Sequence, residues 1–159
     1  MTKDIVKTKD TATCQTERHT VFLGLGTNLG NREQNLEECI SLLAERVGEV
    51  LRVSSFIHTE PWGFNSENGF LNAAISMETS LDPFQLLKVT QEIERAMGRS
   101  TKSIDRVYHD RVIDIDILLY DTLSLHTPEL TIPHPLMSER PFVMTPLREI
   151  LPENDTTRL

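Results

Sequence analysis

Cysteine is scarce in this sequence, and its two cysteines form no recognised motif. Only Cys14 and Cys39 are present, and neither has a CxxC partner. A disulfide framework or a zinc site is therefore not expected. The polar segment 1–19 also lacks the apolar core of a secretory signal. Both features predict a reduced, cytoplasmic setting.

Long apolar runs and positive charge are missing as well. No stretch approaches the about 20 apolar residues that cross a membrane, so no membrane partner is predicted. The formal net charge is −8, which disfavours proteins that wrap nucleic acid, because such binding depends on neutralising phosphates. Basic side chains nevertheless gather within residues 99–111, at Arg99, Lys102, Arg106 and Arg111.

A glycine loop of the common nucleotide-binding forms is absent too. The segment GLGTNLG, residues 24–30, spaces its glycines as GxGxxxG rather than GxGxxG, and no GK[ST] follows. We interpret it as a tight turn between a strand and a helix.

The remaining pattern predicts one globular domain. The chain has 159 residues, with 38% hydrophobic and 25% charged side chains, which suits a single core. Residues 1–19 are interpreted as a flexible leader and 20–159 as the domain. The order of periodic segments is β-α-β-β-α-β, as in the ferredoxin-like α+β fold, with an antiparallel sheet, helices packed on it and a C-terminal extension. The expected strands are 20–26, 49–58, 70–80 and 111–120, and helices are expected after Asn31 and Asp82.

The strand RVIDIDILLY, residues 111–120, carries two carboxylates in an apolar run. Asp114 and Asp116 are two residues apart, so both face one side of the strand, while Ile113, Ile115, Ile117 and Leu119 are expected on the other. Carboxylates in an interior are costly unless they are paired. Arginines are one possible partner. Magnesium is the other, because it takes one or two carboxylates together with phosphate oxygens, and the adjacent basic segment favours it.

Four further positions suit phosphate or nucleotide binding but also have ordinary structural explanations. Gln91 and Glu94 are neighbours on one helical face, which is either a binding face or a solvated one. His134 is either a turn histidine or a phosphate donor. Arg140 is either a surface charge or a phosphate-binding fork.

Phe70 and Asn72 share one face of a predicted strand. A core aromatic beside a satisfied buried amide is one interpretation. The other is a site for a flat heteroaromatic ligand, which stacks on the ring and is read by the amide.

Taken together, the motifs resemble those of 6-hydroxymethyl-7,8-dihydropterin pyrophosphokinase of folate biosynthesis. The matching runs are VFLGLGTNLGNR, FIHTEPWG, FLNAAISMETSL, TQEIERAMGR, RVIDIDILLY and LTIPHPLMSERPFVMTPLREI, within residues 20–152. The resemblance implies a ferredoxin-like fold and transfer of pyrophosphate from ATP to the pterin hydroxymethyl group, with AMP as leaving group.

The resemblance also implies roles for individual residues. Asp114 and Asp116 would bind two Mg²⁺ ions and act in catalysis with Arg99 and Arg111. Phosphate contacts would come from Arg99, Arg111, His134 and Arg140. The ATP site would be lined by Gln91, Glu94, Ile117 and Thr131. The pterin would be held by Thr59, Trp62, Phe70, Asn72 and Phe142. Asn28 would lie on the first mobile loop.

Two positions depart from the family pattern. Tyr108 stands where members often carry Trp, and Glu129 stands where some place an arginine near ATP. The variable length of the basic loop leaves Lys102 and Arg106 unassigned. The expected partners are ATP and the pterin, with a monomer expected and a dimer left open.

Two other classes share the strand–helix order. An RNA-recognition module stacks bases on aromatics of its third strand and has a basic, Gly-rich signature there, but FLNAAISM offers one aromatic and no such signature. A regulatory ligand-binding module has little use for paired aspartates beside arginines. Magnesium-dependent ATP binding discriminates among the three.

Overall fold

The computed structural model describes residues 17–59, 69–98 and 112–152. Within these ranges the strands are β1 (His19–Thr27), β2 (Gly48–Val53), β3 (Ile57–Thr59), β4 (Phe70–Thr79), β5 (Asp114–Tyr120), β6 (Leu125–His126) and β7 (Thr131–Ile132). The helices are α1 (Arg32–Arg46), α2 (Pro83–Gly98), a short 3-10 turn η2 (Met137–Glu139) and α3 (Pro141–Ile150).

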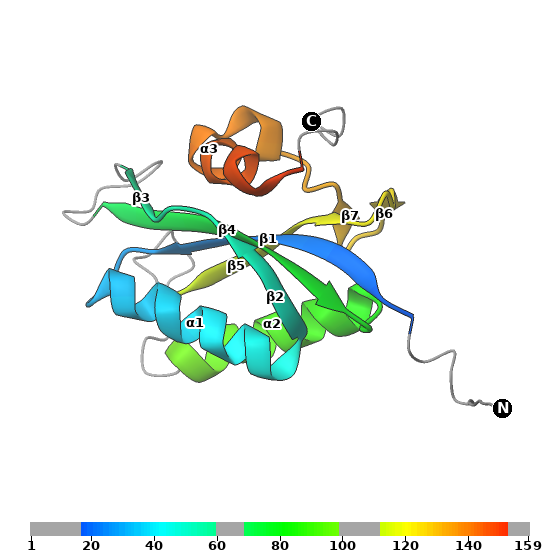
Figure 1. Ribbon diagram of the computed structural model, residues 1–159, viewed down its shortest axis with the longest axis horizontal. Coiled ribbons are helices and arrows are strands. Elements are labelled where there is room, and N and C mark those ends of the chain that lie inside the picture. Colours follow the sequence, from blue (N-terminus) through cyan, green and yellow to red (C-terminus); the bar gives the residue numbers. More distant parts are fainter. Residues whose placement is uncertain (1–16, 60–68, 99–111, 153–159) are drawn as a thin grey trace, which may run out of the picture.

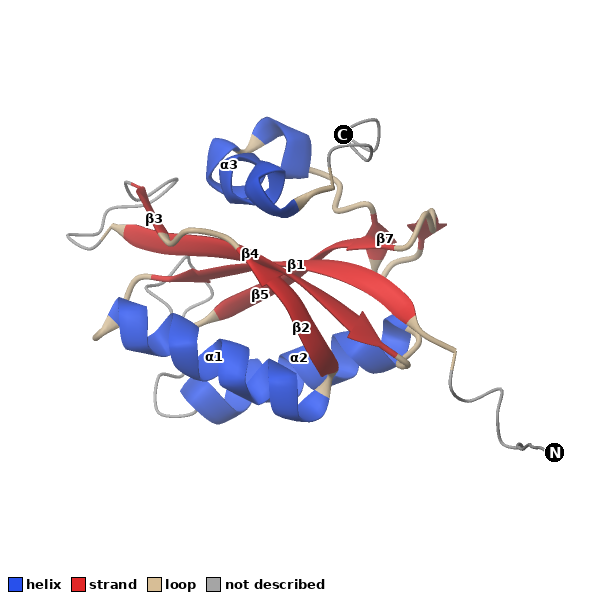
Figure 2. Ribbon diagram, in the orientation of Figure 1, coloured by secondary structure: helices blue, strands red, loops and turns tan. Residues whose placement is uncertain are grey.

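The main sheet has the strand order β2-β4-β1-β5, with β3 also paired to β4. Every pairing in it is antiparallel. Helices α1 and α2 cover one face of the sheet and α3 covers the other (Figures 1 and 2). The predicted α+β class, an antiparallel sheet with helices packed on it, is confirmed.

Two hydrophobic cores form on the two faces of the sheet, as the alternation of strand side chains requires. The larger one joins β1, β4 and β5 to the buried faces of α1 and α2, for example through Leu23, Leu36 and Ile93. The smaller one joins the opposite face to α3, through Phe22, Leu118 and Leu147.

Both long helices begin where the sequence predicts. The side chain of Asn31 accepts a hydrogen bond from the Gln34 amide and so caps α1. Asp82 accepts from the Gln85 amide at 2.8 Å, and the Gln85 side chain accepts from the Asp82 amide in return. These bonds satisfy backbone donors that the first helical turn leaves free.

The expected strand 49–58 is wrong in one respect, because it is broken into β2 and β3. Ser54 lies at the break, where its hydroxyl accepts a hydrogen bond from the Ala74 amide. The neighbouring Ser55 amide donates to the Glu149 carboxylate of α3. The Ser54 amide still donates to the Ala74 carbonyl, but the return bond from Ala74 and the bond of the Ser55 amide go to side chains, which interrupts the regular ladder.

The expected facing of Leu119 is also wrong. In the β1–β5 register, Phe22 opposes Leu119 and Leu23 opposes Ile117, so Leu118 is an extra residue on β5. This bulge shifts the alternation by one residue. Leu119 therefore joins Leu118 in the core beneath α3, while Tyr120 returns to the α1–α2 side.

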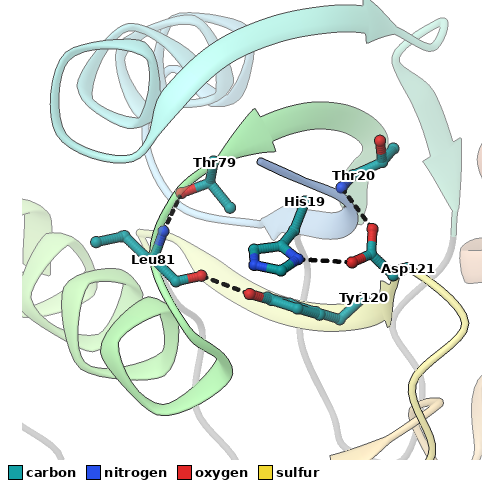
Figure 3. A network of polar contacts seen from close by, with 6 residues as sticks. All are labelled: His19, Thr20, Thr79, Leu81, Tyr120 and Asp121. Atoms are coloured by element: carbon teal, nitrogen blue, oxygen red, sulfur yellow. Dashed lines mark hydrogen bonds and ion pairs between the residues drawn. The ribbon is translucent and has the colours of Figure 1, made fainter. Parts of the chain in front are cut away.

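At the end of the sheet where β1 begins, polar groups bond to one another (Figure 3). His19 Nδ1 lies 2.7 Å from an Asp121 carboxylate oxygen, and the other oxygen accepts from the Thr20 amide. The Tyr120 hydroxyl donates to the Leu81 carbonyl at 2.6 Å. We call His19, Thr20, Leu81, Tyr120 and Asp121 the closed end of the sheet.

Within the three described ranges, no helix is both long and apolar enough to cross a lipid bilayer.

Candidate active site

The other end of the sheet carries several of the predicted site residues on its α3 side. In the register, Gly26 of β1 lies between Asn72 of β4 and Asp114 of β5. Two residues along, Gly24 lies between Ala74 and Asp116. Residues that face one another across antiparallel strands project from the same face. Asn72, Asp114 and Asp116 therefore border a strip of β1 that has no side chains.

The two glycines make room for these neighbours to different extents. A Cβ on Gly26 would come within 2.9 Å of the Asn72 amide oxygen, which is closer than real Cβ atoms come. A Cβ on Gly24 would lie 3.4 Å from the nearest atom of Leu118. We call Gly24 and Gly26 the glycine floor. The interpretation of residues 24–30 as a tight turn is wrong for 24–27, because β1 continues to Thr27. Two glycines at alternate positions of a predicted strand are the signal that could have indicated this role.

Asn72 is oriented by its neighbour on β3. Its side-chain nitrogen donates to the Thr59 hydroxyl at 2.9 Å, and only 6% of Asn72 is exposed. Thr59 faces Phe70 in the β3–β4 pairing, and Phe70 is half-buried. The structure thus brings together three of the residues that the resemblance assigns to the pterin. We call the paired residues 57–59 and 70–72 the β3–β4 ribbon.

Asp114 and Asp116 are both half-buried, and on the same strand face, as predicted. Glu94 reaches the strand between them, because its carboxylate accepts a hydrogen bond from the Ile115 amide at 2.7 Å. This bond links α2 to β5 beside the paired carboxylates.

His134 lies next to this strand. Its amide donates to the Leu118 carbonyl, and its Nε2 lies 3.8 Å from an Asp116 carboxylate oxygen, which is longer than a hydrogen bond. Burial and then the positive charge of Arg140 lower the pKa of His134, while Asp114 acts in the opposite direction. The ring is therefore neutral near pH 7 and has one donor to offer.

The N-terminus of α3 contributes two more predicted residues. Arg140 is the residue before the helix, and its guanidinium carbon lies 5.8 Å from the centre of the Phe142 ring. Such a distance allows a cation–π contact. Phe142 packs against the core beneath α3, on the same side of the sheet as Asp114 and Asp116.

The remaining assigned residues are less clearly grouped. Gln91 is exposed on α2, Thr131 is half-buried on β7, and the side chain of Ile117 is buried in the α1–α2 core with 4% exposure. Asn28 is fully buried just after β1, and Glu129 is exposed. Predictions outside the described residues are those for Trp62, Arg99, Lys102, Arg106, Tyr108 and Arg111.

The chemistry of the two aspartates fits magnesium. Two hard carboxylates on one strand face are the type of ligand that Mg²⁺ takes together with phosphate oxygens. The described residues contain no group of three or more His, Cys, Asp or Glu that could hold a metal ion alone. A protein nevertheless usually supplies only one or two carboxylates to a Mg²⁺ ion that also binds phosphate oxygens and water.

Comparison with known proteins agrees with this geometry. The family model of 7,8-dihydro-6-hydroxymethylpterin-pyrophosphokinase matches residues 22–152. The chain belongs to this family. It is accordingly an enzyme, a pyrophosphokinase of folate biosynthesis.

Two bacterial relatives of the pyrophosphokinase family cover most of the chain. The 2-amino-4-hydroxy-6-hydroxymethyldihydropteridine pyrophosphokinase of Porphyromonas gingivalis is 48% identical over 133 residues, which is 83% of this chain and 90% of that protein. The one of Bacillus subtilis is 42% identical over 130 residues, or 81% of this chain and 76% of that protein.

Solved structures with a similar fold are larger proteins. A crystal structure described as HPPK-DHPS in complex with substrates has a TM-score of 0.68 at 18% identity and covers 90% of this chain. A Plasmodium falciparum HPPK-DHPS variant also gives a TM-score of 0.68, at 17% identity and with 90% of this chain covered. This chain spans only 42% and 41% of those two chains, so the likeness concerns the fold of the shared part.

Proposed function

We propose that this enzyme transfers the pyrophosphoryl group of ATP to the hydroxymethyl oxygen of 6-hydroxymethyl-7,8-dihydropterin and releases AMP. The observation that carries the proposal is the row Asn72–Gly26–Asp114. It sets an amide suited to a flat heterocycle and a carboxylate suited to a metal–phosphate complex on opposite sides of a residue without a side chain. A small bound alcohol and a polyphosphate can meet across such a strip.

Asp114 and Asp116 would hold two Mg²⁺ ions against the ATP phosphates. Bound there, the ions would neutralise phosphate charge and orient the attacking and leaving oxygens. The support is the shared face of the two side chains and their place beside the glycine floor. The hydrogen bond from Ile115 to Glu94 steadies the backbone between them.

The pterin would bind on the ribbon side of the glycine floor. Asn72 and Thr59 would read its polar edge, while Phe70, Phe142 and Trp62 would contact its ring. Support comes from the Asn72–Thr59 hydrogen bond, which fixes which way the amide points. A fixed amide can offer both a donor and an acceptor to one heterocycle.

ATP would lie on the β5 side, with its phosphates near the arginines. Gln91, Glu94, Ile117 and Thr131 would line its site, and Ile117 would do so through its backbone because its side chain is buried. His134 and Arg140 would donate to phosphate oxygens, together with Arg99 and Arg111. The arginines 99 and 111 would also stabilise charge that develops in the transfer.

The reaction needs placement and charge neutralisation more than covalent help. The hydroxymethyl oxygen would attack the β-phosphorus of ATP, and the bond from that phosphorus to the oxygen on the α-phosphate would break. Transfers of this kind are accelerated mainly by in-line positioning and electrostatic stabilisation. Asn72 and Thr59 supply the positioning on one side, and the carboxylates and arginines supply the charge environment on the other.

The finer features of the fold and setting belong to the same proposal. The strand order β2-β4-β1-β5, with α1 and α2 on one face of the sheet, supports a ferredoxin-like βαββαβ core. The elements β6, β7 and α3 would form its C-terminal extension. The predicted boundary after residue 19 is one residue late, because β1 begins at His19. We further propose a single catalytic domain from His19 onwards with the preceding residues as a leader, a cytoplasmic location and action as a monomer, with a dimer left open.

Product analysis tests the proposal. The chain is incubated with ATP and Mg²⁺, with and without 6-hydroxymethyl-7,8-dihydropterin, and the nucleotides are separated. AMP that forms only with the pterin is the expected result. Pterin-dependent ADP would mean that the γ-phosphorus is attacked, and ATP binding with no product would favour a regulatory module.

A further inference from the structure

Arg32, the first residue of α1, contacts His58 of β3 and Gly69, the residue that precedes β4. Its Nη1 donates to the Gly69 carbonyl at 2.6 Å and lies 3.2 Å from Nε2 of His58. A guanidinium has donors only, so Nε2 of His58 is the acceptor in this contact. One nitrogen of α1 thus joins the strand β3 to the residue before β4.

These contacts lie behind the candidate pterin site. Thr59 pairs with Phe70, and these side chains face α3 as Asn72 does. His58 pairs with Leu71, which packs in the α1–α2 core. Because neighbouring residues of a strand face opposite sides, Arg32 supports the back of the surface that carries Thr59 and Asn72.

There is no space for a side chain at position 69. A Cβ on Gly69 would come within 2.7 Å of a ring carbon of His58 and within 2.7 Å of the Thr59 carbonyl oxygen. Only glycine permits this approach of the two strands. Gly69 therefore lies directly against both the His58 ring and the Thr59 backbone.

Arg32 itself is held by the turn between β1 and α1. Gly30 has a φ of 64°, a left-handed conformation that suits glycine. The Asn35 side chain donates to the Thr27 hydroxyl at 3.1 Å and to the Leu29 carbonyl at 2.7 Å. Thr27 follows Gly26 of the glycine floor. The first turns of α1 are thus bonded to the end of β1 through Asn35, and Arg32, at the start of the same helix, links that helix to His58 and Gly69.

We propose that Arg32 is a positioning residue for pterin binding, which keeps Thr59 and Asn72 at a fixed place relative to the glycine floor and the paired aspartates. The inference rests on the proposed function. It extends that function because Arg32 acts through His58 and Gly69, without touching a substrate. Residues 71 and 72 of the ribbon also pair with β1, whereas β3 pairs, among the described strands, only with β4. The β3 half, which carries Thr59, therefore has few other supports. Misplacement of about 1 Å can reduce turnover roughly 10²-fold.

Three variants test the proposal: Arg32→Met, Arg32→Lys and the matched control Arg46→Met. Methionine keeps an apolar stem but has no donor, and lysine restores a charged donor. Arg46 lies at the other end of α1 and forms an ion pair with Glu92 of α2. Dissociation constants are measured by calorimetry for the pterin, in the presence of a non-hydrolysable ATP analogue, and for that analogue alone.

The expected result is a selective loss. Arg32→Met weakens pterin binding by about tenfold, in keeping with the loss of one charge-assisted hydrogen bond. Binding of the ATP analogue stays within about twofold, because β5 and α2 are not touched by Arg32. Arg32→Lys recovers part of the loss, and Arg46→Met changes neither affinity.

Thermal melting checks that each variant folds. If Arg32→Met does not fold, Gly69→Ala replaces it, since its Cβ disturbs the same cluster from the β4 side. Unchanged pterin affinity overturns the inference, and so does an equal loss for pterin and ATP analogue. A wild-type chain that binds no pterin overturns the proposed function, and the inference with it.

Discussion

β1 and β5 run side by side through two ends of the sheet that are built differently. At the closed end, His19, Thr20 and Tyr120 bond to Asp121 and Leu81 of the chain itself. At the other end, Asn72, Asp114 and Asp116 surround the glycine floor. Gly26 stands seven residues after His19 on β1, so at about 3.3 Å per residue the far side of the glycine floor lies roughly 23 Å from the closed end.

We interpret the closed end as a source of stability and the glycine floor as the proposed site of the reaction. At the closed end, the Asp121 carboxylate bonds to the His19 ring and the Thr20 amide. The Tyr120 hydroxyl bonds to Leu81 and so joins β5 to the segment before α2 (Figure 3). At the glycine floor, polar side chains stand beside backbone that bears none. Substitutions at the two ends should therefore separate stability from activity.

The largest expected effect comes from a pair of identical substitutions, Asp116→Asn and Asp121→Asn. Asp116→Asn removes a carboxylate beside the glycine floor, and we expect kcat to fall roughly 10²- to 10³-fold, as when one electrostatic stabiliser is lost. Asp121 has a φ of 49°, which asparagine tolerates, so Asp121→Asn should keep kcat within about twofold. Steady-state AMP formation at saturating Mg²⁺ measures both.

Wild-type turnover in Asp116→Asn would contradict the assignment of metal and phosphate binding to this strand face. A large loss in Asp121→Asn would show that the two ends do not differ as described.

Asn72→Leu should have the next largest effect. Leucine has a similar size but cannot bond to Thr59 or to a heterocycle, so the KM for the pterin should rise about 10- to 100-fold. The KM for ATP should change little, because Asn72 lies on β4, away from β5. Ser76→Ala is the control on the same buried strand face. Equal rises of both KM values would point to a general loss of structure instead.

The two glycines sharpen the comparison at one strand. Gly26→Ala places a Cβ 2.9 Å from the Asn72 amide oxygen, so the amide must shift and the pterin KM should rise several-fold. In Gly24→Ala the nearest atom to the new Cβ is one of Leu118 at 3.4 Å, an ordinary contact, so this variant should have the smaller effect on the pterin KM. Kinetics of the two variants side by side provide the measurement, and the reverse order of effects would refute this view of the glycine floor.

The smallest effect on activity is expected for Tyr120→Phe at the closed end. Loss of the bond to the Leu81 carbonyl should lower the free energy of unfolding by about 1–3 kcal/mol, while kcat and both KM values stay unchanged. Denaturant unfolding and the AMP assay measure this pair. Lost turnover in a folded Tyr120→Phe variant would argue against a purely structural closed end.

Tyr120 also makes a prediction about pH. Burial, and then the negative charge of Asp121, raise the pKa of Tyr120 to about 12, against about 10 in an unfolded chain. Its contribution is complete below pH 10 and is lost as the pH rises towards 12. The stability difference between wild type and Tyr120→Phe should therefore shrink over this window in unfolding titrations.

Local features of the fold were predictable from sequence because they depend on neighbouring residues. The caps at Asn31 and Asp82 and the shared face of Asp114 and Asp116 follow from spacings of two or three residues. The bulge at Leu118 and the break at Ser54 depend on distant partners, Phe22 and Ala74, which spacing along the chain cannot supply.

The candidate site also contains features that the sequence predicts and features that only the folded chain shows. The resemblance to a known family named its residues, and the strand register shows why Asn72 and Asp114 lie on either side of Gly26. The contact between Arg32 and Gly69 joins positions 37 residues apart. Neither residue type suggests that contact by itself, so only the folded chain reveals it.

Amide chemical shifts in solution test most directly that ligands bind at the glycine floor. Spectra of the ¹⁵N-labelled chain are recorded before and after addition of Mg²⁺, a non-hydrolysable ATP analogue and the pterin. The account predicts that the largest changes fall on Gly24, Gly26, Asn72 and the amides of 114–117, while His19, Leu81 and Asp121 hardly move. Changes concentrated at the closed end, with the glycine floor unaffected, would contradict it.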